Sequence, residues 1–223
     1  MRVLIACEES QAVCKAFRAL GHEAFSCDVQ ECSGGHPEWH VKGDALHLIN
    51  GRCLFTTMDG QRYYQMRQWD LLIAHPPCTY LSSVGAARLF GADHQVKDPE
   101  RERLGFAAKD FFMRFLSADC EKICVENPAP LKYYGLPPYS QIIEPYQYGH
   151  PYKKRTCLWL KGLPELVPTD IVEPTGCWVV SGGGPTCRVK LTGGKSVRDP
   201  KLRSKTFPGI ARAMAEQWGG VVE

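Results

Sequence analysis

A cysteine on a rigid turn is the first feature of the sequence that is suited to chemistry. The segment His75-Pro76-Pro77-Cys78 comes directly after the apolar run at 69–74. Each proline fixes its own φ angle and favours an extended residue before it, so we expect Cys78 to project from the carboxyl end of a strand. Ligands bind at that edge in open α/β sheets. Cys78 is therefore a candidate nucleophile, and the alternative is a small hydrophobic residue that packs nearby.

A carboxylate follows a later strand-like run in the same way. Glu126-Asn127-Pro128 ends the run that begins at 122, so Glu126 is expected at the same edge as Cys78. Partial burial beside apolar neighbours would raise the pKa of Glu126 and favour its proton-donating form. The alternative is a glutamate that caps a helix or forms an ion pair.

The elements that position these residues alternate as in a parallel α/β sheet. Helices are predicted over 11–20, with Ser10 as N-cap, and over 100–116. Asp28 ends the second strand, where nucleotide-binding sheets hold a ribose. The β-rich runs 141–148 and 156–160 predict an antiparallel closing pair. The other predicted strands are 3–7, 24–29, 71–74 and 122–125.

Composition supports a globular chain of 223 residues with 44% hydrophobic residues and a net charge of +3. The first residues enter a strand-like segment without a signal peptide, and no apolar run approaches the ~18 residues of a membrane span. We therefore expect a cytoplasmic protein with no membrane partner. Positive charge gathers at 186–212 and at 153–155, where contacts with phosphates or a solvated loop are both possible readings.

The eleven cysteines are odd in number and irregularly spaced, so reduced thiols are expected. Cys27, Cys32, His36 and His40 fall close together and raise the alternative of a zinc site. No Cys-x-x-Cys pair is present and Cys27 lies inside a strand pattern, so we expect no metal.

Six ordered blocks carry a resemblance to a known family. The chain resembles the DNA cytosine-C5 methyltransferases over most of its length, and is most similar to the short members carried by phages and prophages. This resemblance implies a Rossmann-like class I methyltransferase fold, α/β, with a mostly parallel sheet and an antiparallel closing strand pair. The blocks are 3–8, 26–28, 74–79, 126–128, 154–164 and 206–211.

The resemblance also implies roles for individual residues. Cys78 would add to carbon 6 of cytosine, and Glu126 would bind the ring at nitrogen 3. Lys154 stands where the family has a catalytic arginine. The substrate-binding residues implied are Ser82, Asn127, Arg155 and Thr156. The cofactor implied is S-adenosylmethionine, with the binding residues Ile5, Glu8, Ser10, Asp28, Asp44 and Pro76.

Three departures from the family pattern bear on function. The first loop lacks glycines and carries Glu8 and Glu9, which would repel the carboxylate of the cofactor and attract its amino and sulfonium groups. Lys154 and Thr156 replace two arginines, and Arg155 is expected to point to the opposite face. The segment in the place of a target-recognition domain, 162–205, is short.

These features predict three parts of the chain: a catalytic domain at 1–161, a Gly/Pro/basic excursion at 162–205, and a C-terminal helix at 206–223 that packs back on the catalytic domain. The implied activity is methyl transfer to carbon 5 of cytosine in DNA in a bacterial cell or phage-infected host, with a possible recognition partner protein. The alternatives are a pyrimidine nucleotide or single-stranded substrate, or a noncatalytic binder of nucleic acid or of a host protein.

Overall fold

A seven-stranded sheet forms the centre of the computed structural model, which describes residues 1–178 and 199–221. The strand order is β3-β2-β1-β6-β7-β10-β8, and β10 runs antiparallel to both of its neighbours. The strands are β1 (Arg2–Ala6), β2 (Glu23–Asp28), β3 (His40–Lys42), β6 (Leu71–Ala74), β7 (Ile123–Pro128), β8 (Gln141–Ile143) and β10 (Thr156–Lys161).

This topology confirms the fold class. The first five strands of the sheet, taken in chain order, lie in the 3-2-1-4-5 order of a doubly wound sheet. The antiparallel β10, the seventh strand of the sheet in chain order, lies between the fifth (β7) and the sixth (β8), which completes the Rossmann-like class I methyltransferase arrangement. The pairing of β8 with β10 is the predicted closing pair. The predicted run at 141–148 is shorter than expected because Pro145 starts a 3₁₀ turn.

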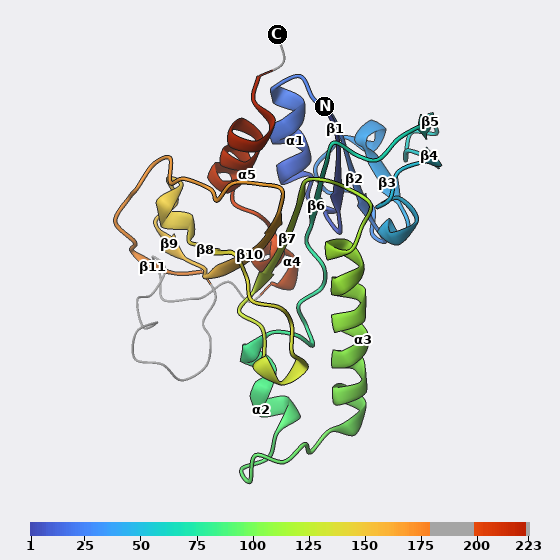
Figure 1. The fold of residues 1–223 in the computed structure, drawn as a ribbon. Coiled ribbons are helices and arrows are strands. Elements are labelled where there is room, and N and C mark those ends of the chain that lie inside the picture. The colour runs from blue at the N-terminus through green and yellow to red at the C-terminus, as the bar shows by residue number, and fades with distance from the viewer. Residues whose placement is uncertain (179–198, 222–223) are drawn as a thin grey trace.

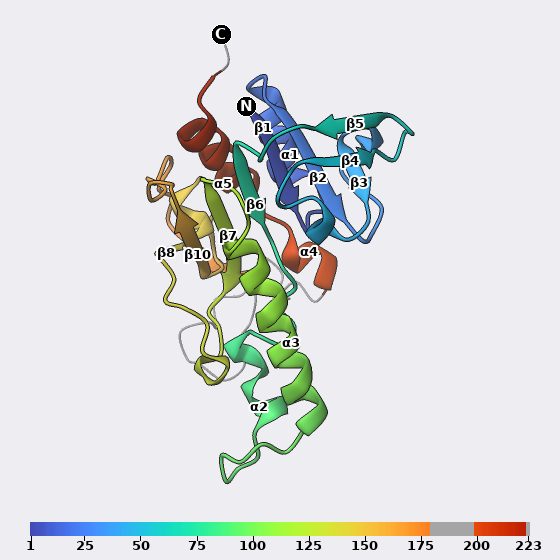
Figure 2. The ribbon, with the colours of Figure 1, turned by 45° about the vertical axis from the view of Figure 1, so that its right-hand side comes forward.

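Two layers of helices cover the two faces of the sheet (Figures 1 and 2). On one face, α1 (Ala12–Ala19) packs beside α5 (Pro208–Met214), which continues as a π-helical turn to Gly219. On the other face lies α3 (Pro99–Leu116). Successive strand residues such as Leu4 and Ile5 are fully buried in opposite layers, which is why the central strands read as continuous apolar runs.

The remaining elements are short. The helix α2 (Ala86–Leu89) and the first turns of α3 extend beyond the end of the sheet (Figure 1). The helix α4 (Pro200–Ser204) precedes α5. Two small sheets pair β4 (Cys53–Thr56) with β5 (Arg62–Gln65), and β9 (Tyr152–Lys153) with β11 (Gly176–Cys177). The 3₁₀ turns are Pro37–Trp39, Ala45–His47, Ser83–Gly85, Lys132–Tyr134 and Pro145–Gln147.

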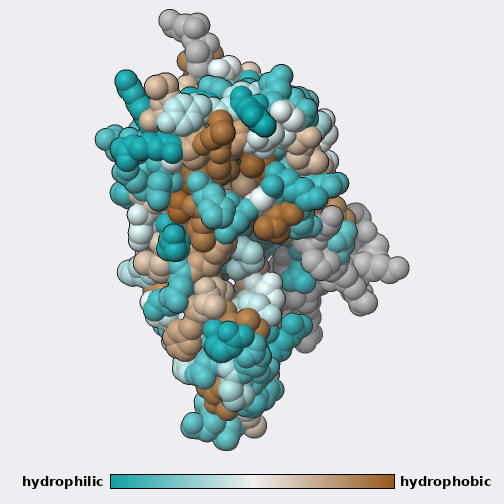
Figure 3. All heavy atoms as spheres, turned by 90° about the vertical axis from the view of Figure 1, so that its right-hand side faces the viewer, coloured by the Kyte–Doolittle hydropathy of each residue, from teal (hydrophilic) through white to brown (hydrophobic). Residues whose placement is uncertain are grey.

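The β4–β5 hairpin carries side chains that the sequence analysis did not single out. Leu54, Tyr64 and Met66 are 66%, 58% and 72% exposed. Figure 3 shows that hydrophobic side chains gather on the upper half of the face that bears this hairpin and α3. Within the part of the chain described, no helix combines the length and the hydropathy needed to cross a membrane.

Part of the predicted excursion at 162–205 lies outside the described residues, including Arg188, Lys190, Lys195 and Arg198. Nine cysteines of the described ranges carry free thiols. Cys177 takes part in a disulfide, so the expectation of reduced thiols fails at that position.

Replacing Phe112 by alanine should lower the free energy of unfolding by about 3–5 kcal/mol, because the change leaves a cavity between α3 and the sheet. Phe112 is fully buried, whereas Phe106 on the same helix is 42% exposed. Phe106→Ala is the matched control and should cost much less. Urea denaturation of both variants measures the difference, and equal losses would contradict the packing described.

Candidate active site

Cys78 and Glu126 reach the same edge of the sheet because β6 and β7 are neighbouring parallel strands. Ala74 at the end of β6 is in register with Val125, directly before Glu126. His75 follows β6 directly: its backbone N–H donates to the carbonyl of Ala6 in β1 at 2.9 Å, and its side chain contacts Glu126 of β7. Strand pairing thus brings His75 beside Glu126 and places the turn that carries Cys78 at the same edge of the sheet.

The turn that holds Cys78 is fixed from both sides. The Cys78 carbonyl accepts hydrogen bonds from the backbone N–H groups of Leu81 at 3.1 Å and Ser82 at 3.0 Å. The buried amide of Asn127 donates to the carbonyl of Pro76 at 2.7 Å. Cys78 itself is exposed, so the alternative of a buried packing residue does not describe it.

The thiol of Cys78 lies in the field of three charged groups. Its pKa is raised because surrounding protein atoms desolvate the thiolate and because the Glu126 carboxylate is near; Lys154 and Arg203 act in the opposite direction. A nucleophilic thiolate therefore forms less readily than in an ordinary cysteine until a further positive charge or a bound substrate changes this balance.

Glu126 differs from the sequence-based expectation. Burial alone would raise its pKa, but the hydrogen bond from His75 and the charges of His75 and Lys154 outweigh burial, and the net pKa is lowered. Nδ1 of His75 lies 3.0 Å from Oε2 of Glu126, and the two side chains are only 10% and 14% exposed. Glu126 is therefore ionised at neutral pH, and the expectation of a proton-donating form is wrong.

Lys154 approaches the same place from the turn before β10. Its Nζ donates to the carbonyl of Lys205 at 3.2 Å and lies 5.9 Å from the ring centre of Phe207. Burial lowers the pKa of Lys154, while Glu126 and Cys78 oppose that shift. Lys154, Glu126 and Thr156 also line a small cavity of about 10 Å³ beside Phe207, which is close to the space that one water molecule needs.

The other expected substrate residues are placed less uniformly. The hydroxyl of Thr156 is buried and donates to the carbonyl of Lys154 at 2.9 Å. Arg155 is exposed. The hydroxyl of Ser82 accepts from the N–H of Val84 at 3.3 Å and so caps a 3₁₀ turn. Asn127 acts on the backbone of the cysteine turn, as described above.

The first loop places its two glutamates in different ways. The Glu8 carboxylate turns inward and accepts the N–H groups of Val13 at 2.6 Å and Cys14 at 3.2 Å. It therefore neutralises the start of α1 from within the chain, while burial raises its pKa. Glu9 is also buried, and its Oε2 has no hydrogen-bond partner in the ranges 1–178 and 199–221.

Among the expected cofactor residues, Asp28 and Asp44 lie at one corner. Asp28 ends β2, and Asp44 follows the neighbouring strand β3. Burial is the largest cause of the raised pKa of the Cys7 thiol, and the charges of Asp28 and Asp44 raise that pKa further. Asp28 is half-buried and Asp44 is exposed. Ile5, in contrast, is fully buried in the core beneath α1 and α5, so its side chain does not face this corner.

Ser10 and Pro76 complete the expected cofactor set. The Ser10 hydroxyl accepts from the N–H of Ala12 at 3.5 Å at the start of α1. Pro76 is buried, and its carbonyl is the acceptor of the Asn127 amide.

Sequence reasoning missed three residues of this edge. His75 stood directly before the proline pair, but its partner Glu126 is 51 residues away and nothing local signals their contact. Arg203 of α4 belonged to a basic region with no distinguishing pattern. Glu9 was noted as a charge in the loop, but its unpaired buried oxygen depends on the fold.

Two residues of the alternative zinc site, Cys27 and His40, have other partners. His40 is buried, with Nδ1 2.8 Å from the Ser26 hydroxyl and Nε2 3.0 Å from the carbonyl of Gln30. The sulfur of Cys27 donates to the carbonyl of Gly43. Among the residues that the structure describes, no group of three metal-ligating side chains is found.

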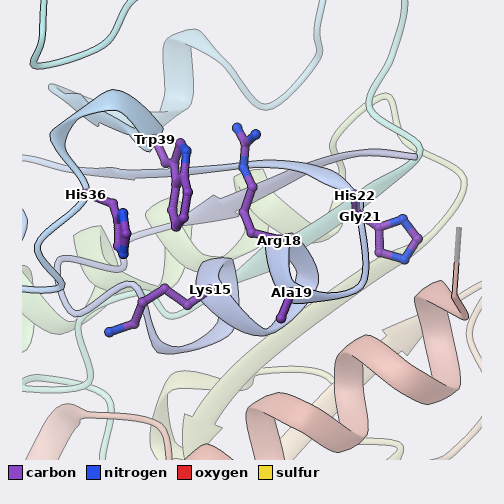
Figure 4. Close-up of a pocket in the computed structure, with 7 residues that line it drawn as sticks. All are labelled: Lys15, Arg18, Ala19, Gly21, His22, His36 and Trp39. Atoms are coloured by element: carbon purple, nitrogen blue, oxygen red, sulfur yellow. The ribbon is translucent and has the colours of Figure 1, made fainter.

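A hollow of about 540 Å³ lies along the outer side of α1 (Figure 4), and none of the expected site residues lines it. His36 stacks on Trp39 with ring centres 3.8 Å apart, and the Arg18 guanidinium lies 5.2 Å from the Trp39 ring centre. Figure 4 shows Trp39 between these two side chains. Both faces of the indole are therefore covered, and the hollow offers no open ring on which a base would stack.

Comparisons with known proteins give the following result. No family model and no curated protein matches the sequence. Among solved structures, a candidate DNA modification methyltransferase encoded within a prophage (E. coli) is similar with a TM-score of 0.44 and 13% identity, over 78% of this chain and 52% of that one. The Dnmt2 methyltransferase of S. pombe is similar with a TM-score of 0.40 and 12% identity, over 74% and 50%.

This chain therefore spans about half the length of either protein. At such low identity and TM-score, the fold class rests on the strand order described above.

Replacing Glu126 by glutamine should speed alkylation of Cys78 at a fixed pH near 8. The change removes a negative charge that raises the pKa of Cys78, while the amide oxygen still accepts from His75. The rate is measured with iodoacetamide and mass spectrometry of the peptide that contains Cys78. Glu100→Gln, at an exposed position of α3, is the control; a rate unchanged in both variants would show that Glu126 does not act on the thiol.

Proposed function

We propose that this chain transfers a methyl group from S-adenosylmethionine to carbon 5 of cytosine in DNA, and that it belongs with the short members of that family carried by phages and prophages. The observation that carries the proposal is the meeting of Cys78, Glu126 and Lys154 at the carboxyl edge of the sheet. Glu126 and Lys154 shift the pKa of each other and of Cys78, and Cys78 in turn acts on Lys154. A nucleophile, a carboxylate and a cation in mutual range suit covalent catalysis on a polar ring.

The chemistry requires the nucleophile because carbon 5 of cytosine is too weakly nucleophilic to take a methyl group directly. In the proposed reaction, the S–H bond of Cys78 breaks and a bond from sulfur to carbon 6 forms, while nitrogen 3 of the ring gains a proton. The ring then carries electron density at carbon 5. After methyl transfer, loss of the proton at carbon 5 and departure of the Cys78 thiolate restore the aromatic product. The base must leave the duplex to reach the site.

Lys154 and Glu126 have complementary tasks in this scheme. The Lys154 ammonium lies in the field of the thiol and favours its ionised form. The Glu126 carboxylate accepts a hydrogen bond from the protonated ring nitrogen, where the proton neutralises the negative charge that thiolate addition places on the ring. Thr156 and Arg155 are proposed to contact the substrate at the rim of the same edge.

The residues at the cofactor corner fit S-adenosylmethionine in part. Asp28 and Asp44 supply accessible carboxylates for hydroxyl and amino groups, and the unpaired buried oxygen of Glu9 is an acceptor without a partner in the described chain. Glu8 occupies the start of α1 and is thereby removed from direct contact. When bound, the cofactor supplies an electrophilic methyl group on a sulfonium centre.

DNA is the proposed partner, with a further protein that assists recognition. The segment at 162–205 is short beside a target-recognition domain, and low sequence specificity follows if it acts alone. The same shortness supports the second candidate, a single-stranded or nucleotide pyrimidine substrate. The occupied start of α1 supports the third, a noncatalytic binder.

Covalent trapping tests the reaction. The protein is incubated with S-adenosylmethionine and DNA that contains 5-fluorocytosine, whose fluorine blocks the final elimination, and the adduct is measured by mass. We expect an adduct with the wild type and none with Cys78→Ala, whereas Cys32→Ala, which removes a free thiol elsewhere, should still give it. Single-stranded DNA and a free nucleotide are run in parallel. Absence of an adduct on all three substrates would sink the enzymatic proposal in favour of a binder.

Cofactor binding is tested apart from catalysis. Asp28→Asn should weaken binding of S-adenosylhomocysteine about tenfold or more in calorimetry, because a charged hydrogen bond to a ribose hydroxyl is worth about 1.5–3 kcal/mol. Asp93→Asn is the matched control, since the Asp93 carboxylate accepts a nearby backbone N–H of its own exposed loop. Equal affinity of the wild type and Asp28→Asn would remove Asp28 from the cofactor site.

A further inference from the structure

His75 is a buried ionisable residue at the centre of the proposed site, and the scheme above gives it no role. It lies in the first position after β6, where its backbone N–H is bonded to β1 through the carbonyl of Ala6. Its side chain crosses to β7, and Nδ1 meets Oε2 of Glu126 at 3.0 Å. His75 therefore joins three adjacent strands at their carboxyl ends.

The surroundings of the ring indicate its charge. Nδ1 faces a carboxylate oxygen and must carry a proton, while Nε2 is buried with no hydrogen-bond partner among the described residues. The Glu8 carboxylate, at the end of β1, also acts on the ring. Two nearby carboxylates favour the imidazolium over the neutral ring. The pKa of His75 is raised in consequence, although burial opposes this.

Lys154 does not hold the Glu126 carboxylate in the way that His75 does. Its ammonium is bonded to the carbonyl of Lys205, and it affects Glu126 through its charge, without a hydrogen bond between the two in the described structure. The orientation of the Glu126 carboxylate depends on the contact with His75. An ionised carboxylate that loses its partner inside a protein lowers the stability of the fold, and it takes up a proton more readily.

We propose that His75 is a positioning residue for Glu126: it fixes the direction of this carboxylate and keeps it ionised, so that Glu126 acts as an acceptor for the protonated ring nitrogen and not as the source of its proton. This inference rests on the proposed function. In the first step, the proton lost by the Cys78 thiol and the proton gained by ring nitrogen 3 then balance without any change in the protonation of Glu126.

The expected pH dependence has a definite sign. The charged groups that face the pair are Glu8 from the β1 loop, Lys154 from the turn before β10, Cys78 from the turn after β6, and Arg203 of α4, which acts on Cys78 and Lys154. With His75 present, Glu126 remains ionised to low pH. Without it, the pKa of Glu126 rises, and activity should be lost at a higher pH as the solution is acidified.

Two substitutions separate the hydrogen bond that orients Glu126 from the positive charge that keeps it ionised. His75→Ala removes the hydrogen bond and the charge together, so we expect adduct formation on 5-fluorocytosine DNA to fall at least about tenfold at neutral pH. The acid limb of the pH–rate profile should also move upward by about one pH unit or more. His75→Asn keeps a short donor but not the charge, so the rate at high pH should be largely restored while the acid limb stays displaced. His22→Asn, which changes another buried histidine, should follow the wild type.

A second measurement needs no turnover. The carboxyl carbon of Glu126 is titrated by NMR in the wild type and in each variant, and its pKa should rise in both His75 variants. If the wild type forms no adduct but the titration shifts as expected, the proposed reaction fails and the role of His75 in holding Glu126 stands. If folded His75 variants, checked by circular dichroism, keep the wild-type pH profile and the wild-type titration, the inference is overturned.

Discussion

A buried carboxylate has to be compensated, and in this chain the contact between His75 and Glu126 meets that need at the point where two parallel strands end. Removing one partner of such a pair leaves an uncompensated charge and typically costs about 3–5 kcal/mol. The edge of the sheet is arranged accordingly. The proline turn that carries Cys78 begins one residue after His75, and the amide of Asn127, one residue after Glu126, holds that turn by the Pro76 carbonyl. Residues next to each other at the ends of the same two strands thus compensate the charge of Glu126 and hold the backbone of the turn that carries Cys78.

Charge compensation also governs the start of α1, where the positive end of the helix dipole is compensated by a carboxylate. A helix N-terminus attracts anions, and many nucleotide-binding sheets leave it open for a ligand. Here the Glu8 carboxylate fills it from inside the protein. The negative charge that a ligand would otherwise bring is already present, so the proposed cofactor would meet Asp28, Asp44 and Glu9 with hydrogen-bond donors and not with an anionic group.

The sequence was sufficient for the sheet and for the exposure of Cys78, because apolar runs and prolines act locally. The helix α3 followed from helical periodicity and α1 from the residues expected at its two ends, whereas the Rossmann-like arrangement of the strands was implied by the family resemblance. The ionisation of Glu126 could not be predicted, since the residue that reverses the effect of burial is distant in sequence. The inward turn of Glu8 depends on how the loop meets α1. Short elements such as the β4–β5 hairpin carry too few residues for a periodic signal.

The loop between β1 and α1 also has a mechanical consequence. Cys7 and Gln11 adopt φ angles of 59° and 56°, which cost a residue with a side chain roughly 1–2 kcal/mol each. Two hydrogen bonds between the Gln11 side chain and the backbone of His36 offset this cost. Nε2 of Gln11 donates to the His36 carbonyl at 2.8 Å, and Oε1 accepts from the His36 N–H at 3.1 Å. A glycine loop would hold such a shape without a brace and would bend freely. This loop is instead tied to the segment after β2 by two hydrogen bonds, so a displacement of one of these two segments is passed directly to the other.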